Sequence, residues 1–193
     1  QCCEDLALMR TIPGMIVMNP SDDVEAKAAV KAALDHEGPV YIRFGRLAVP
    51  VINDRPDYKF EIGKGVVLRE GTDVTIIATG LEVGESLEAA EKLAADGISA
   101  KVINIHTIKP LDEDLVVAAA QETGKVVTVE EHSVIGGLGS AVCDCLSAKA
   151  PTKVMKIGVN DTFGESGPAL ELIKKYGLDA DSIYAKVKAF VAE

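Results

Sequence analysis

Arg46 is the first residue of this 193-residue chain whose type and setting point to chemistry. It follows Gly45 at the end of a predicted strand, Val40–Phe44, and the glycine is expected to let the backbone turn sharply there. An arginine in this position could fork onto two oxygens of a phosphate group, and its guanidinium keeps its charge at any working pH. The alternative is a solvated arginine at a strand end, which the residues taken alone favour.

A second group of chemically capable residues is Glu130-Glu131-His132, which follows a predicted strand. A carboxylate beside an imidazole stabilises its protonated form, so His132 could act as a general base. No nucleophile is spaced with it, and we favour a structural or interface role.

The glycine-rich turn Gly136-Gly-Leu-Gly139 comes next, before a predicted helix. It could present a helix N-terminus to a phosphate, but it lacks the third glycine of the dinucleotide fingerprint. Close helix packing or a subunit contact is the interpretation we favour for this turn.

Other candidate residues are predicted to have structural or surface roles. Phe163 lies in an exposed-looking loop that we interpret as facing a partner, with a ligand loop as the alternative. We expect Arg43 to be structural, Arg10 to be a salt-bridge partner at a surface or interface, His106 to be a turn residue, and His36 to be a cation at a helix end.

Composition argues against several classes of function. The net charge is −10 without a basic cluster, which argues against a nucleic-acid partner, because neutralising phosphates needs grouped Lys and Arg. No run approaches the ~20 apolar residues that a membrane span needs, so no membrane partner is expected. The cysteines have no CxxC spacing and no signal peptide precedes them, which favours reduced thiols in the cytoplasm. These cysteines are Cys2, Cys3, Cys143 and Cys145, and the last two are predicted to pack in the core.

Strands and helices alternate along the chain, which predicts a mainly parallel sheet covered on both faces. One helix begins near Asp22, with Glu25 in the capping-box position. The segment 47–58 has no periodicity and is a predicted linker. Because the chain opens at Gln1 with a helix already under way at 4–10, we expect protein in front of it. The other predicted helices are 22–34, 85–95, 110–124, 138–148, 169–176 and 181–191, and the predicted strands are 16–18, 40–44, 65–68, 74–78, 100–105, 126–129 and 154–157.

Several segments resemble transketolase-like enzymes that use thiamine diphosphate. The turn after Glu130 is similar to the last domain of that family, and the first part of the chain is similar to the end of its pyrimidine-binding domain. The segments similar to the last domain also include Gly71–Gly80, Ile105–Asp112 and Gly158–Gly167, and those similar to the pyrimidine-binding domain are Glu4–Arg10, Ile12–Met15 and Pro20–Asp23.

The resemblance implies an α/β fold in three parts. Residues 1–48 would be the C-terminal portion of a pyrimidine-binding-type domain, 49–64 a linker, and 65–193 a three-layer transketolase C-terminal-type domain with a mainly parallel sheet. The best fit is the C-terminal part of a transketolase, particularly the split form made as two polypeptides. Close alternatives are 1-deoxy-D-xylulose-5-phosphate synthase and the β chain of a 2-oxoacid dehydrogenase.

The implied function is transfer of a two-carbon ketol unit between sugar phosphates, a reaction of the pentose phosphate pathway, in a cytoplasmic enzyme. The complete enzyme would use thiamine diphosphate and Mg²⁺, an N-terminal section as partner, and dimer contacts. The family's cofactor and metal motifs are not in this sequence, so the chain alone is predicted to bind no cofactor or metal and to lack catalytic residues. Arg46 matches the family arginine that binds the substrate phosphate. An alternative of another class is a non-catalytic anion- or nucleotide-binding interaction module that uses Gly136–Gly139.

Overall fold

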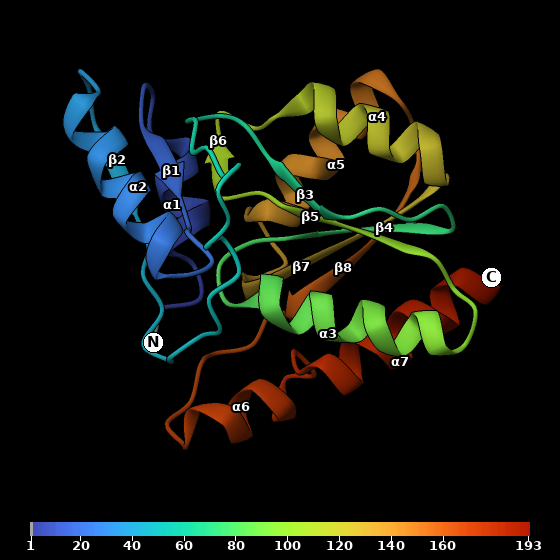
Figure 1. Cartoon of the computed structure of the whole chain (residues 1–193). Coiled ribbons are helices and arrows are strands. Elements are labelled where there is room, and N and C mark those ends of the chain that lie inside the picture. Colours follow the sequence, from blue (N-terminus) through green and yellow to red (C-terminus); the bar gives the residue numbers. More distant parts are fainter. Residues whose placement is uncertain (1) are drawn as a thin grey trace.

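The computed structural model describes residues 2–193, so Gln1, where the predicted first domain begins, lies outside the described residues. The fold is α/β, as the sequence predicts (Figure 1). A five-stranded sheet with helices on both faces makes up most of the molecule, and a three-stranded sheet lies at one side of it.

The larger sheet has the strand order β3-β5-β4-β7-β8 and is mainly parallel. Every residue of β4 is buried, as expected for an interior parallel strand between two helical layers. The edge strand β3 (Val66–Arg69) is antiparallel to β5. The parallel strands are β4 (Val74–Ala78), β5 (Ala100–Asn104), β7 (Lys125–Ser133) and β8 (Lys153–Val159).

Helices cover both faces of this sheet, which gives the predicted three layers (Figure 1). Because successive strand residues point to opposite faces, Ile76 packs in the core on one side and Ile77 in the core on the other. One face is covered by α3 (Glu82–Ala95) and α7 (Ala180–Ala192), with the short α6 (Ala169–Lys175) before α7, and the other by α4 (Glu113–Thr123) and α5 (Leu138–Lys149).

The smaller sheet is built from both sides of the irregular segment between residues 42 and 66. Its order is β2-β1-β6, where β1 (Ile16–Met18) and β2 (Val40–Ile42) are parallel. The third strand, β6 (Thr107–Lys109), comes shortly after β5 and pairs antiparallel with β1. The first part of the chain, with helices α1 (Asp5–Thr11) and α2 (Asp23–Asp35), is therefore joined to the second part by strand pairing as well as by the connecting segment.

The structure departs from several of the predicted elements. Strand β2 ends at Ile42 and not at Phe44, and helix α3 begins at Glu82 and not at residue 85. Strand β6 was not predicted, because its pairing partner β1 is remote in sequence. Strand β7 continues to Ser133, which pairs with Val159 of β8 after an irregularity. Helix α4 begins at Glu113 and not at residue 110, because the side chain of Asp112 accepts a hydrogen bond from the N–H of Leu115 and so caps the helix.

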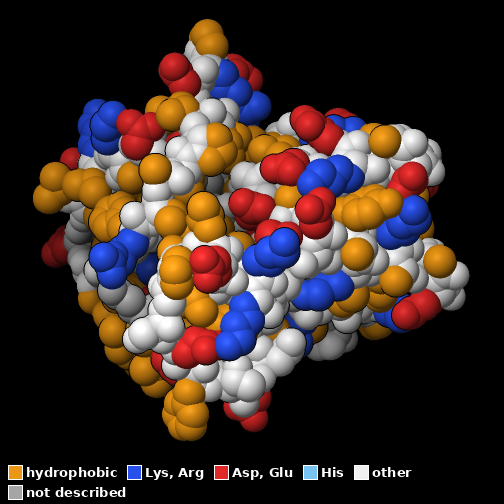
Figure 2. All heavy atoms as spheres, turned by 90° about the horizontal axis from the view of Figure 1, so that it is seen from below, with side chains coloured by type: hydrophobic (Ala, Val, Ile, Leu, Met, Phe, Trp, Pro, Cys, Tyr) orange, Lys and Arg blue, Asp and Glu red, His pale blue; other side chains and the backbone are white. Residues whose placement is uncertain are grey.

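The surface is mixed in character. Acidic and basic side chains are interspersed over the face formed by α3, α6 and α7 (Figure 2). Phe163 is 92% exposed in the loop before α6, consistent with the exposed loop expected from sequence. All four cysteines are free, and of the two predicted core cysteines Cys145 is buried and Cys143 half-buried. Within residues 2–193 no helix has the length and apolar character that crossing a bilayer requires.

Candidate functional site

Arg46 lies in the irregular segment that follows β2, and its side chain is exposed. Because β1 and β2 are parallel, this segment leaves the carboxyl edge of the smaller sheet, where the ligand sites of parallel sheets gather. No ion pair or hydrogen bond within the described residues engages its guanidinium, so the charge is available to an anion. Gly45 has an unstrained backbone and room for a Cβ, so the turn does not depend on glycine as the sequence suggested.

Arg43 differs from Arg46 in that its side chain is fully engaged. It is only 15% exposed, and its Nε lies 3.2 Å from a carboxylate oxygen of Asp5. Its NH1 lies 3.6 Å from Glu131. Asp5 also accepts a hydrogen bond from the hydroxyl of Tyr41 at 2.7 Å. Arg43 therefore ties β2 to α1 and β7, which is the structural role that the sequence predicts.

A buried carboxylate, Glu25, joins three separate segments. It accepts hydrogen bonds from the backbone N–H and the hydroxyl of Ser21 at 2.7 and 2.8 Å. The hydroxyl of Tyr58 donates to it at 2.7 Å, and the amide of Asn104 in β5 donates at 2.9 Å. Glu25 is fully buried, so these bonds satisfy polar oxygens that would otherwise be costly to keep from water. Sequence reasoning missed this network because its partners are up to 79 positions apart.

The predicted capping box at the start of α2 is only half formed. The side chain of Asp22 accepts from the N–H of Glu25 at 2.8 Å, as an N-cap should. The Glu25 carboxylate does not return a bond to the N–H of Asp22, because it binds Ser21 and the distant partners described above.

His132 is fully buried against α1. The N–H of Ala7 donates to its Nε2 at 3.3 Å, and its Nδ1 lies 2.8 Å from the carbonyl oxygen of Ser133. These two contacts fit a neutral ring with its proton on Nδ1. Burial lowers the pKa of His132, which favours that neutral form. The geometry fits the structural role favoured from the sequence.

Glu130 fills the N-terminus of α5 from inside the protein. Its two carboxylate oxygens accept the N–H groups of Leu138 at 2.7 Å and Gly139 at 2.8 Å. These are N–H groups that a bound phosphate would need at this helix end. A Cβ at Gly137 would lie 2.0 Å from the Glu130 carboxylate, so the glycine permits the close packing. The structure thus favours close packing over nucleotide binding at this turn.

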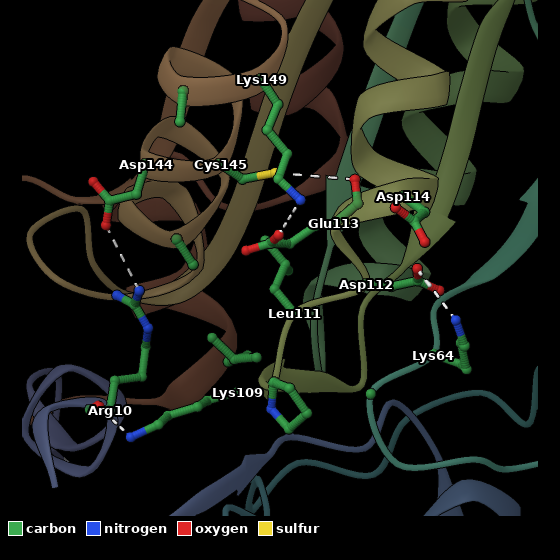
Figure 3. Close-up of a pocket in the computed structure, with 15 residues that line it drawn as sticks. Arg10, Lys64, Lys109, Leu111, Asp112, Glu113, Asp114, Asp144, Cys145 and Lys149 are labelled. Carbon is green, nitrogen blue, oxygen red and sulfur yellow. Dashed lines mark hydrogen bonds and ion pairs between the residues drawn. The ribbon is translucent and has the colours of Figure 1, made fainter. Parts of the chain in front are cut away.

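A cavity of about 760 Å³ lies between α1, β6, α4 and α5 (Figure 3), and Arg46 is not among the residues that line it. Its charged side chains are largely paired with one another, and Arg10 takes part as the predicted salt-bridge partner. The pairs are Lys149 with Glu113 (2.5 Å), Lys64 with Asp112 (3.8 Å) and Arg10 with Asp144 (3.9 Å). Lys109 donates to the carbonyl oxygens of Arg10 and Ile12. Because these positive and negative side chains pair with one another, the cavity favours neither an anionic nor a cationic ligand.

A metal site would require several ligating side chains close together. Among residues 2–193 no three His, Cys, Asp or Glu side chains are arranged to hold a metal ion. The described residues thus do not offer a ligand set for the Mg²⁺ that the family resemblance implies.

Comparison with known proteins agrees with this architecture. Residues 63–183 match the family model of the transketolase C-terminal domain, and residues 1–51 match that of the transketolase pyrimidine binding domain. A solved structure described as "Split gene transketolase, inactive beta4 tetramer" superposes with a TM-score of 0.92 and is 49% identical. The match covers all of this chain and 62% of that one.

Curated relatives include a 6-deoxy-6-sulfo-D-fructose transketolase subunit, SqwH, of Clostridium sp. (strain MSTE9), which is 50% identical and matches 93% of this chain and 56% of its own length. A subunit of the apulose-4-phosphate transketolase of Phocaeicola vulgatus is 41% identical over 97% of this chain and 60% of its own. A 1-deoxy-D-xylulose-5-phosphate synthase of Geobacter sulfurreducens is 42% identical over 97% of this chain and 30% of its own.

The chain therefore spans no more than three fifths of the length of these relatives. The family assignment rests on the two matched domains, which follow each other along the chain and together cover residues 1–51 and 63–183. The chain belongs to the transketolase family.

Proposed function

We propose that this chain is the C-terminal part of a split transketolase-type enzyme and that Arg46 binds the phosphate group of its sugar substrates. The reaction would be transfer of a two-carbon ketol unit between sugar phosphates. Two relatives support a substrate with a tetrahedral anionic end, because their names specify a sulfo-sugar and a sugar phosphate.

The observation that carries the proposal is the contrast between two neighbouring arginines. Arg43 is held by two carboxylates, whereas Arg46 is exposed in the irregular segment that follows the carboxyl end of β2. A guanidinium left free at such an edge can form two parallel hydrogen bonds to a phosphate. In this family that position is the one expected to hold the substrate phosphate.

The complete enzyme would need a partner. Transketolases depend on thiamine diphosphate, which supplies the nucleophile and the electron sink of the reaction when bound. We propose that an N-terminal section holds the cofactor and its Mg²⁺, and that two such assemblies form a dimer in the cytoplasm. The four free cysteines are consistent with a reducing compartment. This chain would contribute the phosphate-binding arginine and surfaces for its partners.

The test is substrate discrimination by the reconstituted complete enzyme, which holds this polypeptide together with the proposed N-terminal section. Arg46→Ala should raise KM for phosphorylated sugars roughly tenfold to a hundredfold, the range expected on losing a charged hydrogen-bonding partner. KM for free sugars of equal length should change little. Arg69→Ala, which removes an arginine from the edge strand β3, is the matched control. An equal rise in KM for phosphorylated and free sugars would show that Arg46 does not bind the substrate phosphate.

A 1-deoxy-D-xylulose-5-phosphate synthase is the second candidate, favoured by the relative from Geobacter sulfurreducens. Product analysis separates the two activities. Ketol transfer keeps the hydroxyl on C1 of the new sugar, whereas the synthase product lacks it. A 2-oxoacid dehydrogenase β chain, the third enzyme alternative, would form neither sugar product.

A further inference from the structure

The segment that carries Arg46 is exposed, yet it is anchored at both of its ends. At the first end, the backbone N–H of Arg43 donates to the carbonyl oxygen of Met18 in β1 at 2.9 Å. At the second end, the backbone N–H groups of Ile52 and Asn53 both donate to one carboxylate oxygen of Asp22, each at 2.7 Å. The free length of the loop is thus limited to the few residues on either side of Arg46.

Asp22 divides its two oxygens between two tasks. Oδ1 caps helix α2 by accepting from the N–H of Glu25 at 2.8 Å, and Oδ2 holds Ile52 and Asn53. The residue is only 4% exposed. Burial would raise the pKa of Asp22, but the hydrogen bonds from Glu25, Asn53 and Ile52 outweigh it and lower the pKa below its ordinary value. The carboxylate is therefore ionised at neutral pH, with each oxygen engaged by N–H donors.

The residues beyond this anchor are also held by hydrogen bonds. Asn53 is fully buried, and its side-chain amide donates to the hydroxyl of Ser21 at 3.0 Å. Ser21 in turn donates to the buried carboxylate of Glu25. The end of the loop is consequently fixed to a network that also includes β5.

Apolar contacts seat the middle of the segment. Leu47 and Pro50 line a small cavity of about 190 Å³ together with Leu81 of the α3 N-terminus and Ile173 of α6. A Cβ at Gly84 would lie 3.4 Å from the ring of Pro50, so the glycine lets the loop lie close on α3. The loop thus rests on the larger domain while Arg46 stays in solvent.

We propose that Asp22 is a positioning residue for Arg46, and this inference rests on the proposed function of that arginine. By holding Ile52 and Asn53, the Asp22 carboxylate keeps the loop short and the guanidinium near one place before substrate arrives. If the loop were released, it would gain conformational entropy that is lost again when the substrate binds. Phosphate binding by Arg46 would therefore become weaker but would not be abolished.

The variant Asp22→Asn separates the two tasks of this side chain. Asparagine is a good N-cap, so its Oδ1 can still accept from Glu25. Its NH₂ group would face the two N–H donors of the loop and cannot accept from them. Asp23→Asn is the matched control, because it removes an equal charge from an exposed neighbour at the same helix start.

Two measurements test the proposal. In the reconstituted enzyme, Asp22→Asn should raise KM for phosphorylated sugars roughly twofold to tenfold, the range expected from freeing one ordered side chain, with KM for free sugars unchanged. In the Arg46→Ala background, Asp22→Asn should add nothing, because its effect acts through the arginine. In the chain alone, amide hydrogen exchange at Ile52 and Asn53 should become faster in Asp22→Asn but not in Asp23→Asn.

The outcomes are distinguishable from those of the proposed function. An Asp22→Asn effect equal for phosphorylated and free sugars, or one that persists in the Arg46→Ala background, overturns the positioning role while Arg46 keeps its own. Unchanged exchange at Ile52 and Asn53 also overturns it, without reference to activity. If Arg46→Ala itself fails to discriminate, the proposed phosphate site is lost, and the positioning role with it.

Discussion

The carboxylate of Glu130 accepts a hydrogen bond from the backbone N–H of Gly139 at 2.8 Å, and both residues are buried. An acid from within β7 thus occupies the positive end of the α5 macrodipole. The turn that joins these elements must therefore be compact, and burial raises the pKa of the acid. Each condition leads to a prediction.

Gly137→Ala should destabilise the protein by about 2 to 3 kcal/mol, the range expected when a methyl group is forced into a packed interior. Its Cβ would meet a Glu130 carboxylate oxygen at 2.0 Å and Nδ1 of His132 at 2.7 Å. Urea unfolding measures the loss. Gly45→Ala, where a Cβ meets nothing within 4 Å, should stay within about 0.5 kcal/mol of wild type. Equal effects of the two substitutions would contradict the close packing at residue 137.

Glu130 should make stability fall as pH rises. Burial raises its pKa from 4.5 to about 7, although the hydrogen bonds from Gly139 and Leu138 oppose the shift. Between these two values the folded state retains a proton that the unfolded state has lost. The stabilising contribution is therefore full below the lower value and is lost as pH rises through about 7.

The measurement for Glu130 is the urea midpoint at several pH values from about 4 to 8, a span that brackets both pKa values. Glu130→Gln should flatten the decline, whereas the exposed Glu91→Gln should leave it as in wild type. A wild-type slope in Glu130→Gln would show that this carboxyl does not titrate in the stated window.

Glu82 should oppose folding at alkaline pH. It is fully buried, and neither of its oxygens has a hydrogen-bond partner among the described residues. Burial, with smaller contributions from Glu131 and Glu85, raises the pKa of Glu82 well above its ordinary value. Glu82→Gln cannot ionise, so its stability relative to wild type should increase by more than about 1 kcal/mol between pH ~5 and ~8. Thermal unfolding at both pH values checks this, and a constant difference would refute it.

Arg43→Ala and Arg46→Ala should differ sharply in stability. Removing Arg43 leaves Asp5, which is 8% exposed, without its cationic partner and should cost about 2 to 4 kcal/mol. Removing the exposed Arg46 should change stability by less than about 0.5 kcal/mol. Chemical denaturation of both variants provides the comparison, and similar losses would mean that Arg46 has a structural contact of its own.

The local patterns predicted most of the fold. The strand of β4 was visible as an apolar run, and the end of α4 was visible at Gly124, which adopts the left-handed backbone of a helix C-terminus. Arg46 was visible as a charge after a strand, and its role in binding stays a prediction. These features depend on neighbours in sequence, which periodicity and capping rules describe.

The parts that were not predicted depend on contacts between distant residues. Glu25 was expected to complete a capping box, but its carboxylate binds Tyr58 and Asn104, which no local rule can place. Asp22 was expected only to cap a helix, and its second oxygen holds the loop of Arg46. A buried carboxylate is expected to accept hydrogen bonds, but the sequence does not show which residues donate them.

The pairing of β6 with β1 bears on how this protein could be shortened. Removing the residues before β3 would remove strand β1, which pairs with β6 in the smaller sheet. The backbone N–H and C=O groups of β6 would then lack their hydrogen-bond partners. The truncation would also expose the side chain of Ile108 to solvent, because this side chain packs against Leu6 and Val17. A truncated piece beginning near residue 65 would thus carry an unpaired strand and an uncovered apolar spot, which together favour aggregation. A shortened version of this protein should therefore keep β1 and β2 together with the larger sheet.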